Sequence, residues 1–535
     1  MRKQILFLMV CLTLIVFVAG IYSAKSNHAA ERASTFIQAS PSNVVFSIPV
    51  GSEGISYAYT DTEEAEQWGP SSLRLGPDGS FLIVDSVSNR ILRFDRQGNK
   101  LQTIPVNDAV GITDVVMDDS NIYALDESAM TPTIFRVSQT GQVLGREALP
   151  ASVRREGLSG ITRGESGEVL MELEGGTSTR RLTGGEAFER ALRGNRFSVN
   201  ISERARPDGR ARRRQQVGSR ARISLPGGIA TIDVDNRFGS VDVLSVDNAG
   251  NVYVLVEELT SAPEILVDQT IRRFRADGTL TGVARVPMNS YTNVRHNVAV
   301  SPNGEVYALV TKRDHAEVIR LEFSTQLPPV LPTRSSRLLA DSADRLQCTR
   351  TRDQMVATAE SFINNTVNLS ATNLNGACSG RTKPRYLGST AGEYKSVAYD
   401  WGGWDTVAAY NQHMAAGRVA GDINSQAVES CSHGVDCSGF VTVCWGITDQ
   451  KYGTRTLPTI SDVIDGADLR RGDILNYAGK HVVMFDRFAR SAQGVKGVMA
   501  WESTTTDAAD RVVYRWSGWR RLAGYIARRY KRVCD

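Results

Sequence analysis

The sequence predicts a multidomain protein in which an all-β repeat region precedes a smaller α+β domain. Residues 45–325 contain recurring strand–turn–strand segments with alternating apolar residues, joined by turns such as Pro77-Asp78-Gly79. Beyond a proline-rich segment the composition changes, because six of the seven tryptophans and most of the seven cysteines lie in the last third. At 535 residues the chain is also too long for one ordinary domain.

The first 24 residues predict export. Met1-Arg2-Lys3 precedes about twenty residues without charge, and a basic start before an apolar run is typical of an export signal. The run is long for a cleaved signal peptide and close to the length of a membrane span. Residues 1–24 are therefore expected to be a signal peptide or a membrane anchor. Either alternative places the rest of the chain outside the cytoplasm, secreted or anchored at the cell envelope.

The repeat region has the period of a β-propeller blade, because Asp85 and Asp126 hold equivalent places 41 residues apart. The copy "GPDGSFLIVDSVSNRILRFD" (Gly76–Asp95) resembles the NHL-type β-propeller repeat. Five copies plus strand material near "NVVFSIPV" predict about six blades, with five or seven also open, although residues 175–240 fit the repeat poorly. Propellers usually present binding surfaces, so this region is expected to bind or target. The net charge of +4 does not indicate nucleic-acid binding.

Residues 326–345 are predicted to be a linker, because the segment "STQLPPVLPTRSS" contains three prolines. Residues 346–535 form the predicted second domain, where "RDQMVATAESFINNTV" has helical spacing. Clustered cysteines in an exported domain predict one or two disulfides among Cys348, Cys378, Cys431 and Cys534. With six histidines and no close Cys-x-x-Cys pair, neither a metal site nor a cofactor is expected.

The stretch "HGVDCSGFVTVCWG" (His433–Gly446) holds the main candidate for chemistry. Its Cys437 could be a nucleophile, a disulfide partner, a metal ligand or a core residue. A helix that begins at Cys437 would place the thiol among backbone N–H groups, which favour a thiolate. Cys444, two turns along, is expected to be buried. We therefore expect Cys437 to be the most reactive thiol, alkylated by iodoacetamide at about pH 6.

A thiolate nucleophile needs a base, and the base needs a group that orients it. His481 opens a predicted strand after an Ala-Gly-Lys turn, and Glu502 is the single acid in the next predicted strand, "GVMAWEST". Taken singly, His481 could be only a turn residue and Glu502 only a surface acid at the end of a strand. Burying an acid in an apolar strand requires a partner, however, and the order of Cys437, His481 and Glu502 suits a triad.

Three motifs resemble the NlpC-type cysteine peptidases, which are bacterial cell-wall hydrolases with a circularly permuted papain-like fold. They are "VAYDWGGWDT" (Val397–Thr406), "DCSGFV" (Asp436–Val441) and "RGDIL" followed by "GKHVVMF" (Arg471–Phe485). The resemblance covers roughly residues 390–505 and implies that residues 346–535 are a papain-like domain of this type.

By that resemblance, Cys437 is the nucleophile, His481 is the general base and Glu502 stands at the family's third polar position. The Tyr399 hydroxyl, with the backbone N–H of Cys437, would stabilise the oxyanion. The neighbouring motif residues are expected to bind substrate: Trp401, Gly402, Gly403, Asp436 and Ser438.

Two features depart from the family pattern. Residues 404–435 form a long insertion between the Trp-Gly-Gly motif and Cys437, predicted to be a helix and a loop that overhangs the cleft. The third residue of the triad is more often His, Asn or Gln than Glu in the family. Both departures leave the Cys437–His481 pair in place.

The resemblance implies an exported cysteine endopeptidase or amidase that cleaves the D-γ-glutamyl–diamino acid bond of peptidoglycan stem peptides. The propeller would bind or target, its ligand a protein or a glycan, and the membrane would be contacted only through the N-terminal segment. Two alternatives stay open. One is a surface binding protein with a vestigial papain-like domain, and the other is an amidase or acyltransferase of the same fold acting on another substrate.

Overall fold

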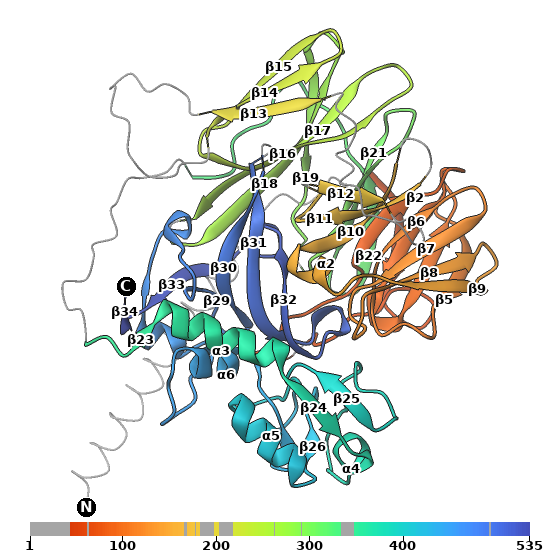
Figure 1. Ribbon diagram of the computed structural model, residues 1–535. Coiled ribbons are helices and arrows are strands. Elements are labelled where there is room, and N and C mark those ends of the chain that lie inside the picture. The colour runs from red at the N-terminus through yellow and green to blue at the C-terminus, as the bar shows by residue number, and fades with distance from the viewer. Residues whose placement is uncertain are drawn as a thin grey trace, which may run out of the picture. The chain divides into compact units, whose positions relative to one another are not determined.

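Most of the chain is β-sheet in the computed structural model (Figure 1). All residues that the structure describes belong to the unit Asn43–Asp535. The expected signal or anchor lies outside the described residues, as does most of the expected linker. The described residues are 43–60, 62, 64–164, 168–176, 178–181, 197–202, 218–261, 263–289, 291–332, 347–491 and 494–534.

Within those ranges, the first half of the chain forms six successive antiparallel sheets, in agreement with the predicted all-β repeat region. The inner strand of one sheet contacts that of the next, as β2 does with β6 and β6 with β10. In chain order the strands are β2 (Ser72–Leu75), β3 (Phe81–Asp85), β4 (Arg90–Phe94), β5 (Lys100–Pro105), β6 (Ile112–Met117), β7 (Asn121–Asp126), β8 (Thr133–Ser138), β9 (Val143–Ala148), β10 (Leu158–Arg163), β11 (Val169–Leu173), β12 (Ser178–Arg181), β13 (Ser198–Ser202), β14 (Arg220–Leu225), β15 (Gly228–Asp233), β16 (Arg237–Val246), β17 (Val252–Ser261), β18 (Ile265–Phe274), β19 (Leu280–Val286), β20 (Val298–Val300), β21 (Val306–Thr311) and β22 (His315–Arg320).

The turn residues explain the hairpins. Between β2 and β3, Gly79 adopts a φ of +78°, and the Asp78 carboxylate accepts a hydrogen bond from the Ser80 N–H at 3.0 Å. The N-terminal strand β1 (Val44–Pro49) pairs antiparallel with β22 and completes the last sheet. This confirms that the "NVVFSIPV" segment contributes a strand.

The described part of the second half mixes helices with one main antiparallel sheet and three two-stranded sheets. The predicted helix after the linker is α3, whose first turn is fixed by a capping box between Thr351 and Gln354. The helices among the described residues are α2 (Ser152–Arg155), α3 (Arg352–Asn364), α4 (Ala371–Asn375), α5 (Val407–Ala415) and α6 (Cys437–Cys444), with short 3-10 turns η2 (Ser86–Ser88), η3 (Leu457–Ile460), η4 (Gly466–Asp468) and η5 (Thr506–Ala508). The strands of this half are β23 (Arg350–Thr351), β24 (Thr366–Leu369), β25 (Gly392–Lys395), β26 (Val419–Ala420), β27 (Ser432–His433), β28 (Ser461–Val463), β29 (Ile474–Tyr477), β30 (His481–Ser491), β31 (Gly494–Thr504), β32 (Arg511–Ser517), β33 (Ile526–Tyr530) and β34 (Val533–Cys534).

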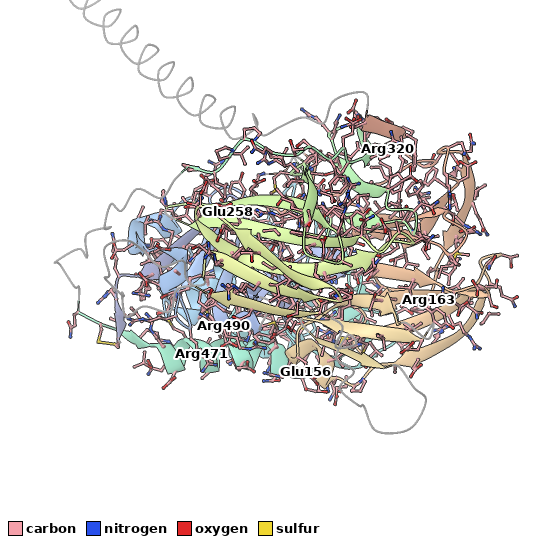
Figure 2. All side chains as sticks on the ribbon, turned by 90° about the horizontal axis from the view of Figure 1, so that it is seen from above. Glu156, Arg163, Glu258, Arg320, Arg471 and Arg490 are labelled. Atoms are coloured by element: carbon pink, nitrogen blue, oxygen red, sulfur yellow. A yellow bond between two sulfur atoms is a disulfide. The ribbon has the colours of Figure 1, made fainter. Side chains whose placement is uncertain are left out.

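The main sheet of the second half continues a sheet of the first half. Its order is β31-β30-β29-β33-β28, β32 also pairs with β31, and β31 meets β16 through Ser240 and Gly494. The two halves therefore share one hydrogen-bonded sheet. Charged side chains lie at exposed positions of both halves, as Figure 2 shows for Arg163 and Arg471. No helix in the described part of the chain combines the length and the apolar character that a membrane crossing requires.

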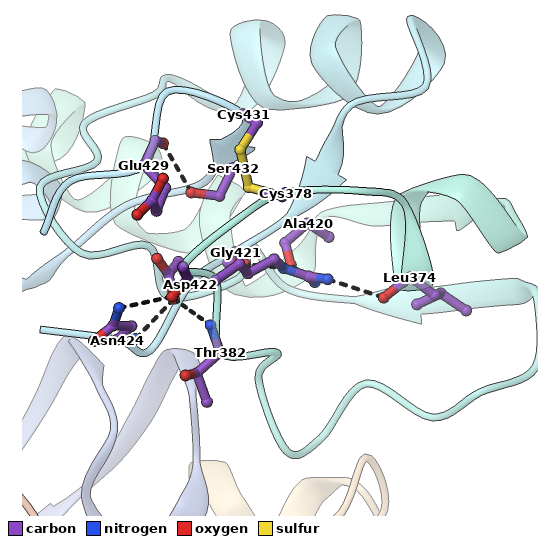
Figure 3. The surroundings of a disulfide bond; sticks show 12 residues. Leu374, Cys378, Thr382, Ala420, Gly421, Asp422, Asn424, Glu429, Cys431 and Ser432 are labelled. Carbon is purple, nitrogen blue, oxygen red and sulfur yellow. Dashed lines mark hydrogen bonds between the residues drawn. A yellow bond between two sulfur atoms is a disulfide. The ribbon is translucent and has the colours of Figure 1, made fainter. Parts of the chain in front are cut away.

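Two disulfides lie in the second half, as the cysteine pattern predicted. Cys348 pairs with Cys534, and Cys378 pairs with Cys431, closing a loop that contains most of the 404–435 insertion. Near the second bridge, the Asp422 carboxylate accepts hydrogen bonds from the backbone N–H groups of Thr382 and Asn424 (Figure 3). The insertion includes α5, which confirms the predicted helix, and is anchored at its far end by this bridge.

Candidate active site

Helix α6 begins at Cys437, where the sequence predicted a helix start. The Asp436 carboxylate caps the helix by accepting a hydrogen bond from the Gly439 N–H at 2.7 Å and from the Ser438 hydroxyl at 3.0 Å. The whole of α6 is buried and packs against α3, β30 and β31. Cys437 and Cys444 are both free thiols. The structure thus places Cys437 at a capped helix terminus inside the core.

The Trp-Gly-Gly turn docks directly on this helix start. The Asp436 N–H donates to the Gly403 carbonyl at 3.0 Å, and the Gly402 N–H donates to the Asp436 carboxylate at 3.1 Å. A Cβ on Gly439 would lie 2.2 Å from the Gly403 carbonyl oxygen, so only glycine allows this approach. The three predicted motifs therefore meet in space. Asp436 and Ser438 use their hydrogen bonds to hold the turn and the helix together.

The structure pairs His481 with Glu502, the two residues that the sequence predicted to act as base and orienter. The imidazole Nε2 lies 2.5 Å from the Glu502 carboxylate Oε2, and the two side chains are 3% and 0% exposed. His481 opens β30 after a turn in which Gly479 has a φ of +81°, and Glu502 lies on β31. Because Nε2 is bound by Glu502, Nδ1 is the nitrogen left for proton exchange.

Two arginines enclose the Glu502 carboxylate. Arg515 Nε donates to Oε1 at 2.6 Å, and Arg521 donates to both oxygens at 2.8 Å. Burial by itself would raise the pKa of Glu502, but the two guanidinium groups and the His481 hydrogen bond outweigh it and hold the pKa well below its usual range. Glu502 is therefore ionised at neutral pH.

Tyr399 lies beside the nucleophile. Its backbone bridges to Val435, two residues before Cys437, and its side chain is buried. Burial, followed by the nearby Cys437 sulfur, raises the pKa of the Tyr399 hydroxyl well above its usual value. The hydroxyl therefore keeps its proton and can donate a hydrogen bond, as the oxyanion role requires.

A segment of the first half packs beside the cysteine site. We call residues 64–68 the cover segment. The Glu64 N–H donates to the Gly479 carbonyl at 2.9 Å, and the Glu64 carboxylate accepts hydrogen bonds from the Thr454 N–H and hydroxyl at 3.0 and 2.7 Å. Cys437 is only 2% exposed. Little of the thiol is therefore accessible to solvent.

Burial corrects one expectation about the thiol. It raises the pKa of Cys437 well above its usual value, and the Asp436 and Glu64 carboxylates act in the same direction. The Lys451 ammonium group and the Val482 N–H favour the thiolate but do not compensate. The helix terminus alone therefore does not provide a free thiolate at about pH 6, since desolvation of the charged form dominates.

Cys437 is expected to react with iodoacetamide before Cys444, at a pH above the usual thiol pKa of about 8.5. Cys437 begins helix α6 and keeps 2% of its surface exposed, whereas Cys444 at the far end of the helix is fully buried. Glu64→Ala should accelerate labelling of Cys437, because it removes both hydrogen bonds to Thr454. Peptide mapping after a short alkylation pulse measures both rates, and urea-unfolded protein provides the reference. Preferential native labelling of Cys444 would contradict the assignment.

Groups of side chains that could hold a metal ion also occur. Asp405 lies 3.0 Å from His413 Nδ1 and 3.5 Å from His433 Nδ1, but the two imidazole rings stack with centroids 3.6 Å apart. Stacked rings direct their lone pairs in parallel, whereas one ion needs them to converge. Burial and then His413 lower the pKa of His433. In each of the other two groups, an arginine forms ion pairs with the carboxylates. Arg74 pairs with Asp114 and Glu172 of the group that also contains His296. Arg521 pairs with Glu66 and Glu502 of the group that also contains His481.

Sequence reasoning missed Arg515, Arg521 and the cover segment. Arg515 carries a weak signal, since it alternates with apolar neighbours in "RVVYRWS" and lies on the strand next to Glu502. Nothing in the sequence connects the cover segment to His481, because the two are more than 400 residues apart.

Comparisons with known proteins add little to the site. No family model matches the chain, and no curated protein matches it. Among solved structures, a streptogramin B lyase is 14% identical over 52% of this chain and 97% of that chain, with a TM-score of 0.29. Virginiamycin B lyase from Staphylococcus aureus is 12% identical over 50% of this chain and 98% of its own, with a TM-score of 0.28. A luciferin-regenerating enzyme is 11% identical, covering 50% and 95%, also with a TM-score of 0.28. At these identities and scores, the similarity carries no inference about activity.

Proposed function

We propose that the chain is an exported cysteine hydrolase of the NlpC type, which cleaves amide bonds of peptidoglycan stem peptides between D-glutamate, through its γ-carboxyl, and a diamino acid. One observation carries the proposal: Cys437 begins a buried helix that packs on the strand opened by His481, whose Nε2 is held by Glu502. The papain-like character of residues 346–535 and the targeting role of the first half belong to the same proposal.

The chemistry follows from this arrangement. Nδ1 of His481 takes the proton of the Cys437 thiol, and the sulfur attacks the amide carbonyl carbon. Tyr399 and the Cys437 N–H donate to the oxygen that becomes negative. When the C–N bond breaks, the imidazolium returns the proton to the leaving amine, and water then hydrolyses the thioester. Glu502 remains ionised throughout and stabilises the imidazolium.

The full-length chain is expected to release new amines from purified peptidoglycan and no new reducing sugar ends. Cysteine with a histidine base suits acyl transfer, whereas glycan hydrolysis needs a suitably spaced carboxylate pair. Mass spectrometry of the released muropeptides identifies the bond that is cut. The full chain is the right material, because β31 and β16 share hydrogen bonds between the two halves. New reducing ends without new amines would show that the proposed reaction is wrong.

The enclosure of the site favours one alternative, a surface binding protein whose second half does not turn over substrate. Cys437, His481 and Tyr399 are each less than 5% exposed. The alternative predicts that peptidoglycan, or fragments of it, bind without any covalent labelling of Cys437. Trapping a thioester on Cys437 by rapid acid quench would exclude this alternative. The two disulfides and the export signal expected at residues 1–24 support a location outside the cytoplasm for either protein.

A further inference from the structure

Alternating charges extend from Glu502 into the first half of the chain in two directions. Arg521 binds Glu502 on one side, and on the other it donates to both carboxylate oxygens of Glu66, at 3.1 Å through Nε and 2.6 Å through Nη2. Arg515 binds Glu502 and also lies 3.0 Å from Asp507, which in turn lies 3.1 Å from Arg295. Glu66 and Arg295 both belong to the first half.

The Glu66 branch comes closest to the imidazole. Glu66 Oε2 lies 3.9 Å from His481 Nε2, the same nitrogen that Glu502 binds at 2.5 Å. Glu66 and Arg521 are both partly buried, with side chains 16% and 11% exposed. Burial lowers the pKa of Arg521, but Glu502 and Glu66 outweigh this effect and raise the pKa well above its usual value. The guanidinium is therefore charged, with a carboxylate on each side.

We propose that Glu66 is a positioning residue of the cysteine site, acting through Arg521 and Glu502 on the orientation of His481. This inference rests on the proposed function and extends it, because the first half then completes the catalytic site in addition to any targeting role. An arginine side chain has many rotamers, and two forked contacts on opposite sides hold the guanidinium in one place. Without Glu66, Arg521 keeps only its hydrogen bonds to Glu502 and to the Ser517 hydroxyl.

The balance of charges around Glu502 also supports a positioning role for Glu66. With Glu66 present, each cation around Glu502 is shared with a second carboxylate, Glu66 for Arg521 and Asp507 for Arg515. Removing the Glu66 charge leaves the Arg521 guanidinium with an unbalanced positive charge close to His481. When His481 becomes an imidazolium during catalysis, the two positive charges repel strongly, because the site is shielded from water. The loss therefore weakens both the placement and the stabilisation of the charged imidazole.

The test compares four full-length proteins: wild type, Glu66→Gln, Glu66→Asp and the control Glu53→Gln. Glu53 is a matched control, because its 87%-exposed side chain pairs with Lys100 on the same half of the chain, away from the site. The first readout is the downfield proton NMR signal of the His481 Nε2–H bonded to Glu502, which requires no substrate. The second readout is the separate measurement of kcat and KM on the amide substrate.

Glu66→Gln is expected to shift the imidazole proton signal upfield and to speed its exchange with water. It should also lower kcat by about 10- to 100-fold with little change in KM, which is less than the full effect of a general base. Glu66→Asp should recover part of both losses, and Glu53→Gln should match wild type. A folded Glu66→Gln protein with an unchanged signal and unchanged kcat would overturn the positioning role.

This design distinguishes a failure of the positioning role from a failure of the proposed substrate. If wild type shows the proton signal and Glu66→Gln loses it, but no variant releases amines from peptidoglycan, then Glu66 positions His481 and the proposed substrate is wrong. If Glu66→Gln does not fold, as judged by circular dichroism, Arg521→Lys carries the test. It keeps the charge but cannot fork between Glu66 and Glu502, so an unchanged signal in that variant also overturns the inference.

Discussion

Replacing Cys437 with alanine is expected to abolish amide hydrolysis, lowering kcat/KM by at least about 10⁴-fold. The thiol is the group that forms the thioester, and no neighbouring side chain can replace it. Cys444 lies on the same helix but at its far end, in the apolar core. Product release from peptidoglycan, followed by mass spectrometry, measures the loss. The variant should fold, because removing one buried sulfur costs about 1–2 kcal/mol.

Cys444→Ala is the matched control. It makes the same chemical change in the same helix, at a residue that is also a free, buried thiol. It is expected to lower the free energy of unfolding by a similar amount, about 1–2 kcal/mol, and to leave kcat/KM close to that of wild type. Activity lost in both variants to the same extent would mean that the helix, and not the Cys437 thiol, is what the reaction needs.

Local sequence patterns predicted the elements that position the site. The helix at Cys437 was predicted from the apolar run that follows the cysteine, and β30 from a glycine turn before "HVVMFD". These are short-range rules, so they do not depend on the rest of the chain. The Cys437, His481 and Glu502 set was then recognised through three motifs, and the structure brings their elements together. Whether the site is catalytic remains a prediction.

Long-range side-chain pairing could not be predicted in the same way. Glu66 and Arg521 are 455 residues apart, and neither has a local pattern that distinguishes it from other acidic or basic residues.

The protonation state of Cys437 could not be predicted from the sequence either. Its position at a helix start is readable from the sequence and favours the thiolate, but its burial depends on packing by segments such as residues 64–68 and favours the thiol. Tertiary contacts decide that balance.

Glu502→Gln is expected to lower kcat about 10- to 1000-fold, since a general acid–base contribution is typically 10²–10⁴. The amide keeps the shape and one acceptor oxygen for His481, but it carries no charge to stabilise the imidazolium. The rate on the amide substrate measures the effect. Glu502→Ala with full activity would place the orienter elsewhere. Asp486 and Asp507 are the acids to test next, although Asp486 already accepts from Tyr514, and Asp507 pairs with Arg295 and Arg515.

The same substitution should also destabilise the fold in a pH-dependent way. Removing the carboxylate leaves Arg515 and Arg521 without their shared buried partner, which costs about 3–5 kcal/mol at neutral pH. The pKa of Glu502 is depressed in the folded state, so its contribution is fully present above the unfolded-state pKa of about 4.3 and is lost as the pH falls toward the folded-state value. Urea unfolding should therefore show a large difference between wild type and Glu502→Gln at pH 7, and the difference should shrink below about pH 4. A difference that is the same at both pH values would mean that the charge of Glu502 does not stabilise the fold, and the low kcat would then have to come from geometry alone.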